Sequence, residues 1–272
     1  MRRRLLATAL AVAVVVPLAA CGGGASSPLE IVRASSAKTV GAESSKVSIV
    51  IDSVVEGETV HFTGEGAFDF AAKKGVLTLD LGSLLAGTKL ETRLLGDVAY
   101  VGVPAALGGL MGGKKFLKLD IAALAAQNEQ FGGLTGGTDP TSGVDALRGA
   151  KDVTKVGSEE VRGESTIHYR GTVDLSAAKA KLEGDAADAV DELTTLLKSN
   201  DIPFDVWIDG AGRVRRSTLA VDLPASAKTD NKAVKTTVTT ELYDFGTTVD
   251  VVEPPAAEVA DGNGLLAGIG KR

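Results

Sequence analysis

The chain has 272 residues, of which 44% are apolar, 24% charged and 4% aromatic. This apolar share excludes a wholly disordered chain, and the length allows one large domain or two small ones. The formal net charge of −6 argues against a general nucleic-acid-binding protein. A single cysteine excludes an internal disulfide and a cysteine-based metal cluster.

The N-terminal segment is typical of an exported lipoprotein. Arg2–Arg4 form a positive region, and the almost unbroken apolar run Leu5–Val16 follows it. The next short motif, LAAC, ends at Cys21 and matches a lipobox, in which a diacylglyceryl group is attached to the cysteine sulfur. An ordinary secreted protein with a chance cysteine is the alternative, and a transmembrane helix fits less well because the apolar run is short. We therefore predict a signal peptide over residues 1–20 and lipidation at Cys21, which places the protein on the extracytoplasmic face of the cell membrane.

A flexible tether and a short helix follow the lipobox. Residues 21–28 are rich in glycine and serine, which is typical of a flexible linker. Leu29–Thr39 is predicted as a helix because Pro28 lies near its first turn and Gly41 lies just past its end.

Most of the remaining chain shows the period-2 alternation of strands with one solvated face. The clearest case is Thr59–Phe70, where apolar residues alternate with polar ones over twelve positions. Two alternating runs flank Gly210-Ala211-Gly212, which predicts a late hairpin at these residues. The predicted strands are Lys46–Val55, Thr59–Phe70, Leu77–Leu81, Leu90–Leu94, Asp97–Val103, Glu160–Leu175, Phe204–Asp209, Arg213–Leu223 and Ala233–Phe245.

Helical patterns interrupt these strands. Ile121–Phe131 and Ser176–Lys198 have apolar residues at helical spacing, and Ser176 is placed to cap the second of them. Asp139-Pro140 opens a further short helix that runs through Leu147. The tail over residues 253–272 has no period and is predicted to be flexible.

These elements predict an α+β fold with a single large curved antiparallel sheet, a U-shaped half-barrel, and helices covering its concave side. The predicted domain spans residues 29–252. Two independent α+β domains are the alternative, with the glycine-rich stretch Gly132–Gly143 as the boundary between them.

The pattern resembles the LppX/LprAFG family of actinobacterial lipoproteins. The resemblance is carried by the lipobox, the short leading helix, the long strands, the segment Gly163–Tyr169 and the late segment Pro203–Asp209. It covers roughly Leu29 to Val252. It implies a fold similar to the LolA/LolB carriers, with an apolar cavity between sheet and helices. It also implies binding and transfer of acyl lipids or lipoglycans in the cell envelope, with an envelope transporter as a further partner.

The apolar face of the first strands is the candidate lipid-binding site. Gly64 and Gly66 lie on that face, where the missing side chains either permit strong coiling or leave room for a ligand. If they leave room, bulk added at Gly66 should reduce lipid uptake while costing little stability. The candidate residues are Val47, Ile49, Ile51, Val60, Phe62, Gly64, Gly66, Phe68, Phe70, Leu77 and Leu79.

A glycine-rich apolar segment after Pro104 is a candidate lid over the cavity, through Leu107, Leu110 and Met111. The alternative is a surface loop that tucks these three side chains onto the core.

Catalytic and metal chemistry find little support in the sequence. Only His61 and His168 are present, and each lies on the polar face of a predicted strand without a neighbouring histidine or cysteine. They are interpreted as surface residues, with no metal, no cofactor and no catalytic role. Two functions remain open: a membrane-tethered lipid carrier with a cavity, and an envelope interaction or structural lipoprotein with a filled core.

Overall fold

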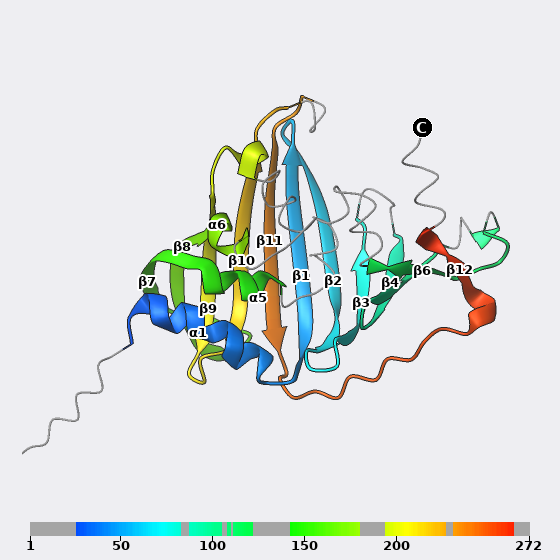
Figure 1. The fold of residues 1–272 in the computed structure, drawn as a ribbon, viewed down its shortest axis with the longest axis horizontal. Coiled ribbons are helices and arrows are strands. Elements are labelled where there is room, and N and C mark those ends of the chain that lie inside the picture. Colours follow the sequence, from blue (N-terminus) through cyan, green and yellow to red (C-terminus); the bar gives the residue numbers. More distant parts are fainter. Residues whose placement is uncertain are drawn as a thin grey trace, which may run out of the picture.

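The computed structural model describes residues 26–82, 87–104, 108–109, 111–121, 142–179, 194–226 and 231–263. Within these residues the strands form one twelve-stranded sheet in the order β12-β6-β5-β4-β3-β2-β1-β11-β10-β9-β8-β7 (Figure 1). Every neighbouring pair is antiparallel except β12 and β6, which run parallel. The strands are β1 (Ser44–Val55), β2 (Glu58–Asp69), β3 (Lys74–Asp80), β4 (Lys89–Leu95), β5 (Val98–Gly102), β6 (Phe116–Asp120), β7 (Ala150–Val161), β8 (Glu164–Asp174), β9 (Asp201–Asp209), β10 (Val214–Leu223), β11 (Val234–Tyr243) and β12 (Val259–Asp261).

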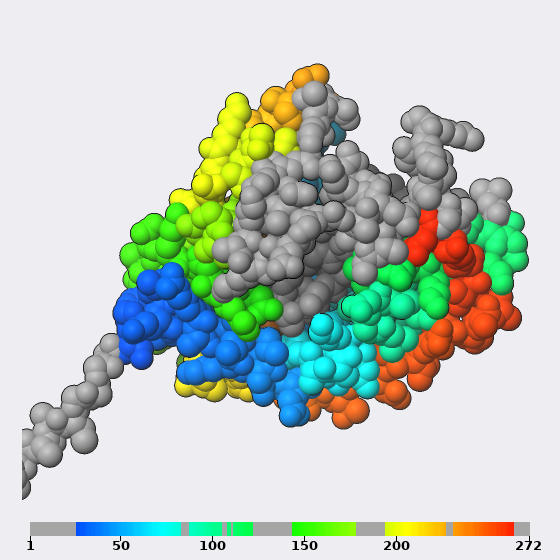
Figure 2. Space-filling view, in the orientation of Figure 1, coloured from blue at the N-terminus to red at the C-terminus, as the bar shows by residue number. Residues whose placement is uncertain are grey.

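The predicted fold class is confirmed: the sheet is large, open, curved and mostly antiparallel. The first and last long strands, β1 and β11, pair in the middle of the sheet and join its two halves. The helices lie on one side of this sheet, in front of β7–β10 in Figure 1. They are α1 (Pro28–Val40), α5 (Ser142–Ala146) and α6 (Leu175–Lys179), with the short 3₁₀ turn η1 (Leu147–Gly149). A further 3₁₀ turn, η3 (Ala256–Glu258), lies at the opposite end of the sheet, directly before β12 (orange to red in Figure 1 and Figure 2).

Helix α1 begins and ends where local chemistry dictates. The Ser27 hydroxyl accepts a hydrogen bond from the Glu30 amide, and the Glu30 carboxylate accepts one from the Ser27 amide, so a capping box satisfies two free donors. The C-terminal half of α1 is tied to the sheet, because the Thr39 hydroxyl accepts a hydrogen bond from the amide of Val214. Arg33 donates to the Ala150 carbonyl at 2.8 Å, which fixes the other end of α1 against β7.

The hydrophobic core lies between these helices and the concave face of the sheet. Val32 of α1 and Val144 of α5 are buried in one cluster with side chains from both halves of the sheet. Large aromatic side chains fill the space that glycines leave on neighbouring strands: Phe204 lies against Gly171, and Phe68 lies against Gly75. The chain from β1 to β11 therefore shares one core.

Three expectations about elements are corrected. The predicted strand Glu160–Leu175 is in fact the end of β7 and all of β8, because the chain reverses at Arg162 and Gly163, both with positive φ. Edge strand β7 lacks a clear alternation because it is bulged and largely exposed. The predicted cap Ser176 is replaced by Asp174, whose carboxylate accepts from the Ser176 amide and hydroxyl.

The C-terminal region also differs from expectation. Residues 253–261, assigned from the sequence to a flexible tail, contain η3 and β12, pair with β6 and contact Tyr100 of β5. The predicted helix Ile121–Phe131 lies almost wholly outside the described residues, as does most of Ser176–Lys198. Among the described residues, no helix has the length and apolar character needed to cross a membrane.

Candidate functional site

The concave face of β1–β4 is uncharged along its central length. The pairing register places Ile51 opposite Phe62, Gly64 opposite Leu79, and Leu77 opposite Thr92, so these side chains share one face. Apart from Glu58, which pairs with Val55 at the hairpin end, this face carries only aliphatic, aromatic, glycine, serine and threonine residues between Ser45 and Val55 and along the facing strands. They are Ser45, Val47, Ile49, Ile51, Ser53, Val55, Val60, Phe62, Gly64, Gly66, Phe68, Gly75, Leu77, Leu79, Leu90, Thr92 and Leu94.

Four of the predicted lipid-binding residues form a filled base. Val47, Ile49, Phe68 and Phe70 are each at most 8% exposed and belong to the central core cluster. The rings of Phe68 and Phe70 lie 6.0 Å apart. This end of the concave face is therefore packed by the protein itself, as the filled-core alternative requires.

The other five apolar side chains of the predicted set form what we call the open patch: Ile51, Val60, Phe62, Leu77 and Leu79. All five are only half-buried, although they lie on the same face as the base, on β1, β2 and the neighbouring strand β3. Ile51 and Leu77 pack against the core cluster from its margin. Val238 of β11 is also half-buried and pairs with Ile51, so the half-buried surface continues across the centre of the sheet. The predicted set is thus brought to one face but divided into two environments.

The two glycines of the predicted set do not leave space for a ligand. A Cβ added at Gly66 would lie 1.9 Å from the carbonyl oxygen of Val76 in β3, so Gly66 permits a close approach of two strands. A Cβ at Gly64 would lie 2.9 Å from the end of the Leu79 side chain, which already occupies that place. The expectation that bulk at Gly66 is tolerated is therefore wrong, and strong coiling is the role the geometry supports.

The remaining predicted site residues are only partly described. Cys21, Leu107 and Leu110 lie outside the described residues. Met111 is half-buried in a turn between β5 and β6, where its amide donates to the Gly108 carbonyl at 3.2 Å.

The convex face carries charged and polar side chains, and the prediction for one of its two histidines is wrong. His61 is exposed as predicted and its Nδ1 lies 2.6 Å from Asp52. His168 is 5% exposed and lies between two carboxylates, with Nδ1 2.9 Å from Glu159 and Nε2 2.5 Å from Asp205. Trp207 covers it, with stacked rings 4.2 Å apart. Its interpretation as a surface residue is wrong.

The row of residues around His168 is a network of paired charges. The Trp207 indole and His168 each hydrogen bond to Glu159, and they hold the pKa of that carboxyl below its usual value. In Glu241, burial favours the neutral acid, but hydrogen bonds from Arg216 and Arg162 outweigh it and lower the pKa.

A second paired cluster lies at the turn between β9 and β10. Burial opposes ionisation of Asp209, yet the Arg213 amide and the guanidinium groups of Arg215 and Arg213 lower its pKa. The cluster at Asp209 lies across the hairpin that the sequence predicts, whereas the partners of His168 and Glu241 come from strands whose pairing no spacing within the sequence reveals. The described residues contain no group of three His, Cys, Asp or Glu side chains placed to hold a metal ion.

The chain is similar to known proteins in sequence. The family model described as LppX_LprAFG lipoprotein matches residues 138–251, which confirms the predicted resemblance. An uncharacterized 31.2 kDa protein from the rplA-rplJ intergenic region of Streptomyces griseus is 28% identical over 264 residues, covering 88% of this chain and 81% of that protein. A protein of Streptomyces coelicolor named as a candidate lipoprotein is 28% identical over 194 residues, covering 68% of this chain and 56% of its own length.

A solved structure is also similar. The crystal structure of the lipoprotein LppX from Mycobacterium tuberculosis has a TM-score of 0.48 and 14% sequence identity to this chain, and the match covers 81% of this chain and 98% of that one.

Proposed function

We propose that the protein is a membrane-anchored, extracytoplasmic lipoprotein that binds acyl lipids or lipoglycans on the open patch and transfers them within the cell envelope. The observation that carries the proposal is the contrast within one face. The filled base is at most 8% exposed, whereas the five side chains of the open patch are half-buried, with Glu58, next to Val60 at the hairpin end, as their charged neighbour on that face. Half-buried aliphatic surface of this kind is what an acyl chain would cover. The match to a lipoprotein family model supports the same role.

Apolar burial alone supplies enough affinity for such a ligand. Burying one methylene group contributes about 0.8 kcal/mol, so a chain of ten to twelve methylenes reaches a useful affinity without a charged clamp. Apart from Glu58 at the hairpin end, the polar residues on this part of the concave face are serine and threonine, and Ser53 bonds to Thr236 at 3.0 Å. The arrangement therefore favours an uncharged hydrocarbon segment over an ionic ligand, and a binding role over a catalytic one.

The anchor follows from the sequence. Cleavage after residue 20 would leave Cys21 as the lipidated N-terminus, and the tether would connect it to the lipid-binding domain over residues 29–252. The six residues between Cys21 and α1 make seven Cα–Cα steps, which span at most about 25 Å when fully extended. The domain would thus stay close to the membrane that supplies its cargo, within reach of an envelope transporter that delivers or accepts it.

A second function is favoured by the filled base. Val47, Ile49, Phe68 and Phe70 are buried in the central core cluster, so this part of the concave face packs against the protein itself. If the open patch is covered in the same way in solution, the protein is an envelope interaction lipoprotein without cargo.

The two functions are separated by mass spectrometry of organic extracts from the mature chain carrying Cys21→Ser, which removes the protein's own acyl groups. The carrier function predicts about one equivalent of co-purified lipid and saturable binding of a fluorescent fatty acid. Extracts free of lipid, together with no saturable binding, would refute it.

The anchor has its own test. Cys21→Ala in the full-length chain should move the protein from the detergent phase to the aqueous phase in detergent partitioning, because no sulfur remains to carry the diacylglyceryl group. Unchanged partitioning would show that Cys21 is not the lipidation site.

A further inference from the structure

The segment Asp244–Asp261, which we call the strap, connects two distant parts of the sheet. It leaves the end of β11 at the centre of the sheet and ends as β12 on the far edge, beside β6 (Figure 1). Its path follows the convex face: Val252 and Glu253 contact Arg93 and Tyr100, whose side chains point away from the concave residues Leu94 and Ala99. The strap is thus a second connection between the centre of the sheet and what we call the arm, strands β3–β6.

Polar contacts hold the strap at both ends and in its middle. Near its start, the Ser44 hydroxyl donates to the Thr247 carbonyl at 2.6 Å. In the middle, Arg93 donates to the Val252 carbonyl at 3.0 Å. Near its end, the Lys115 amide donates to the Glu258 carbonyl at 2.8 Å, and the Lys115 ammonium lies 2.6 Å from the Glu258 carboxylate.

The contact between Tyr100 and Glu253 differs from the others because its donor is buried. Tyr100 is 3% exposed, and its hydroxyl donates a hydrogen bond to the Glu253 carboxylate. Burial and this carboxylate together raise the pKa of Tyr100 to about 12. A strap that lifted off would leave a buried hydroxyl without its partner, so this contact is the one expected to decide whether the strap is seated.

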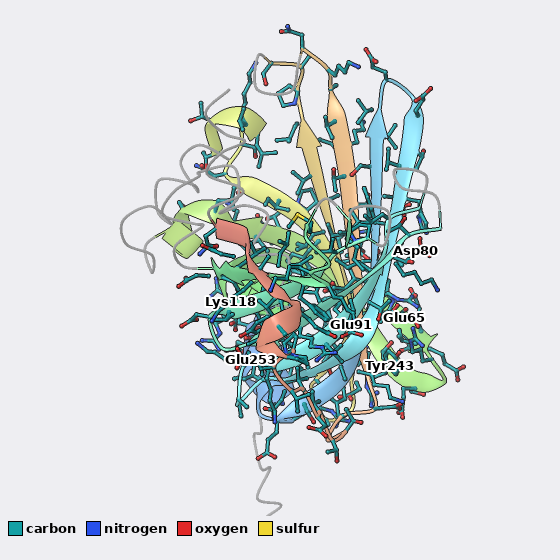
Figure 3. The ribbon with its side chains drawn as sticks, turned by 90° about the vertical axis from the view of Figure 1, so that its right-hand side faces the viewer. Glu65, Asp80, Glu91, Lys118, Tyr243 and Glu253 are labelled. Carbon is teal, nitrogen blue, oxygen red and sulfur yellow. The ribbon has the colours of Figure 1, made fainter. Side chains whose placement is uncertain are left out.

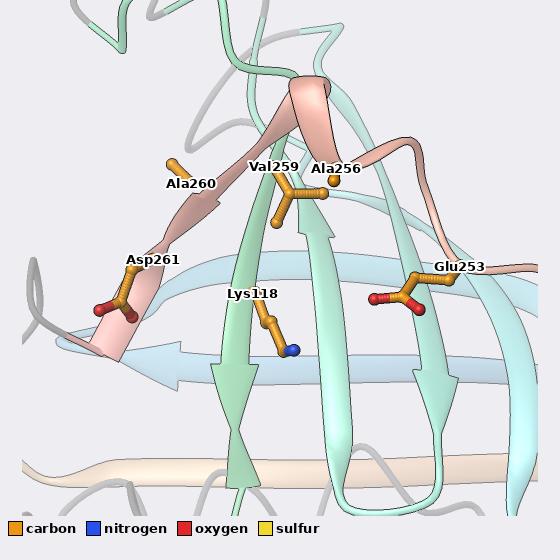
Figure 4. Close-up of a pocket in the computed structure, with 6 residues that line it drawn as sticks. All are labelled: Lys118, Glu253, Ala256, Val259, Ala260 and Asp261. Atoms are coloured by element: carbon orange, nitrogen blue, oxygen red, sulfur yellow. The ribbon is translucent and has the colours of Figure 1, made fainter.

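The strap is held differently along its length. Near its start it is anchored by apolar contacts, since Val249 is 8% exposed and the Arg213 guanidinium stacks over the Phe245 ring. At its end β12 pairs with β6 through only three residue pairs in the less stable parallel arrangement. A surface pocket of about 250 Å³ lies beside this end, lined by Lys118, Glu253, Ala256, Val259, Ala260 and Asp261 (Figure 4). Lys118 and Glu253 lie on the same side of the molecule, beside the strap, in Figure 3. The end of the strap is therefore the part that can detach at the smallest cost.

We propose that the strap is a detachable brace: seated through Tyr100–Glu253 and β12, it fixes the curvature of the arm, and released, it lets the arm move relative to the centre of the sheet. Because the arm carries Leu77 and Leu79, two of the five open-patch residues, its curvature sets the width of the concave face there. The consequence for lipid exchange rests on the proposed function, whereas the motion itself does not.

The test is hydrogen exchange on the mature Cys21→Ser chain with two opposite variants. Tyr100→Phe removes the buried donor, and Tyr243→Phe is the matched control, since its ring stacks with Arg162 and has no contact with Glu253. Lys118→Cys combined with Asp261→Cys joins β12 to β6, because these two residues are Cα partners on the same exposed face.

The brace predicts that Tyr100→Phe speeds amide exchange in β5, β6 and β12 by about tenfold, the effect of one lost hydrogen bond to a charged group. In Tyr100→Phe, amide exchange in β8–β10 should stay at the wild-type rate. In the control Tyr243→Phe, exchange in β5, β6 and β12 should also stay at the wild-type rate. The oxidised cysteine pair should slow exchange in β5 and β6 below wild type, and reduction should restore it. Unchanged β6 exchange in both variants, or an equal increase across the whole sheet in Tyr100→Phe, would overturn the brace.

Lipid release is measured on the same samples. The brace acting on a carrier predicts that the oxidised pair changes the dissociation rate of a bound fluorescent fatty acid at least fivefold. If wild type binds no lipid, the proposed function fails, while the exchange experiment still decides the brace.

Discussion

The filled base and the open patch are two regions of one concave face, yet they bury their apolar residues to different degrees. The base belongs to the core cluster that contains Val32 of α1 and Val144 of α5. Ile51 and Leu77 of the patch pack against that cluster while only half-buried, and Val60 and Phe62 lie farther along β2, toward the β1–β2 hairpin. Alternation along a strand therefore predicts which face is apolar. Where that face is buried depends on which helices pack against it.

The comparison predicts its largest difference for two phenylalanines of β2. Phe68→Ala in the base should lower the free energy of unfolding by about 3–5 kcal/mol, because a 5% exposed ring that fills the space beside Gly75 leaves a cavity. Phe62→Ala in the open patch should cost about 1 kcal/mol, because that ring is only half-buried. Urea denaturation of both variants measures the difference, and equal costs would show that the two regions are packed alike.

On the convex side of the arm, the ionisation of Tyr100 is expected to make the stability of the protein depend on pH. The pKa of Tyr100 is raised to about 12 in the folded protein, against about 10 in an unfolded chain. Its stabilisation is thus complete below pH 10 and is lost as the pH rises through 12, a change of about 2–3 kcal/mol.

The control for this prediction is Tyr100→Phe. Its stability should fall below that of wild type at pH 9, and the gap should close between pH 10 and pH 12. A gap that does not depend on pH would show that the ionisation of Tyr100 is not linked to folding.

Substitution of the glycines between the base and the patch is expected to lower the free energy of unfolding by a smaller amount. Gly66→Ala should cost about 1–3 kcal/mol, because its Cβ would collide with the backbone of Val76 and the strands must shift. Gly64→Ala should cost less than about 1 kcal/mol, because the end of the Leu79 side chain can rotate away. Thermal melts rank the two variants, and the reverse order would remove the argument for coiling at Gly66.

The sequence predicts most strands of this sheet, because each long strand has one solvated face and alternates cleanly. It fails where that condition fails. β7 is a bulged edge strand with mostly exposed residues, and β12 is three residues long and exists only through its pairing with β6. Short strands of this kind are specified by their neighbours and leave little periodic signal.

The candidate site was predictable to the same degree. Every apolar residue assigned to the lipid-binding face does lie on one face, because register follows from alternation. Burial of His168 was not predictable, since its partners Glu159, Asp205 and Trp207 come from neighbouring strands. The role of Gly66 depends on how closely β2 and β3 approach each other. The sequence alone left two roles open for this glycine, strong coiling of the strand and room for a ligand.

The most direct test of a lipid site on the concave face compares the fatty-acid affinity of two variants, each with one substitution in β2. The two substituted residues are adjacent in the chain and lie on opposite faces of the sheet. Phe62→Asn places a polar group in the open patch, and Thr63→Asn makes a matched change on the convex face. Titration of a fluorescent fatty acid into each mature Cys21→Ser variant measures the affinity. We expect at least about tenfold weaker binding for Phe62→Asn, because apolar contact is lost and a polar group must be desolvated, and binding within twofold of wild type for Thr63→Asn. Equal affinity in the two variants, or no binding by wild type, would contradict a lipid site on the concave face.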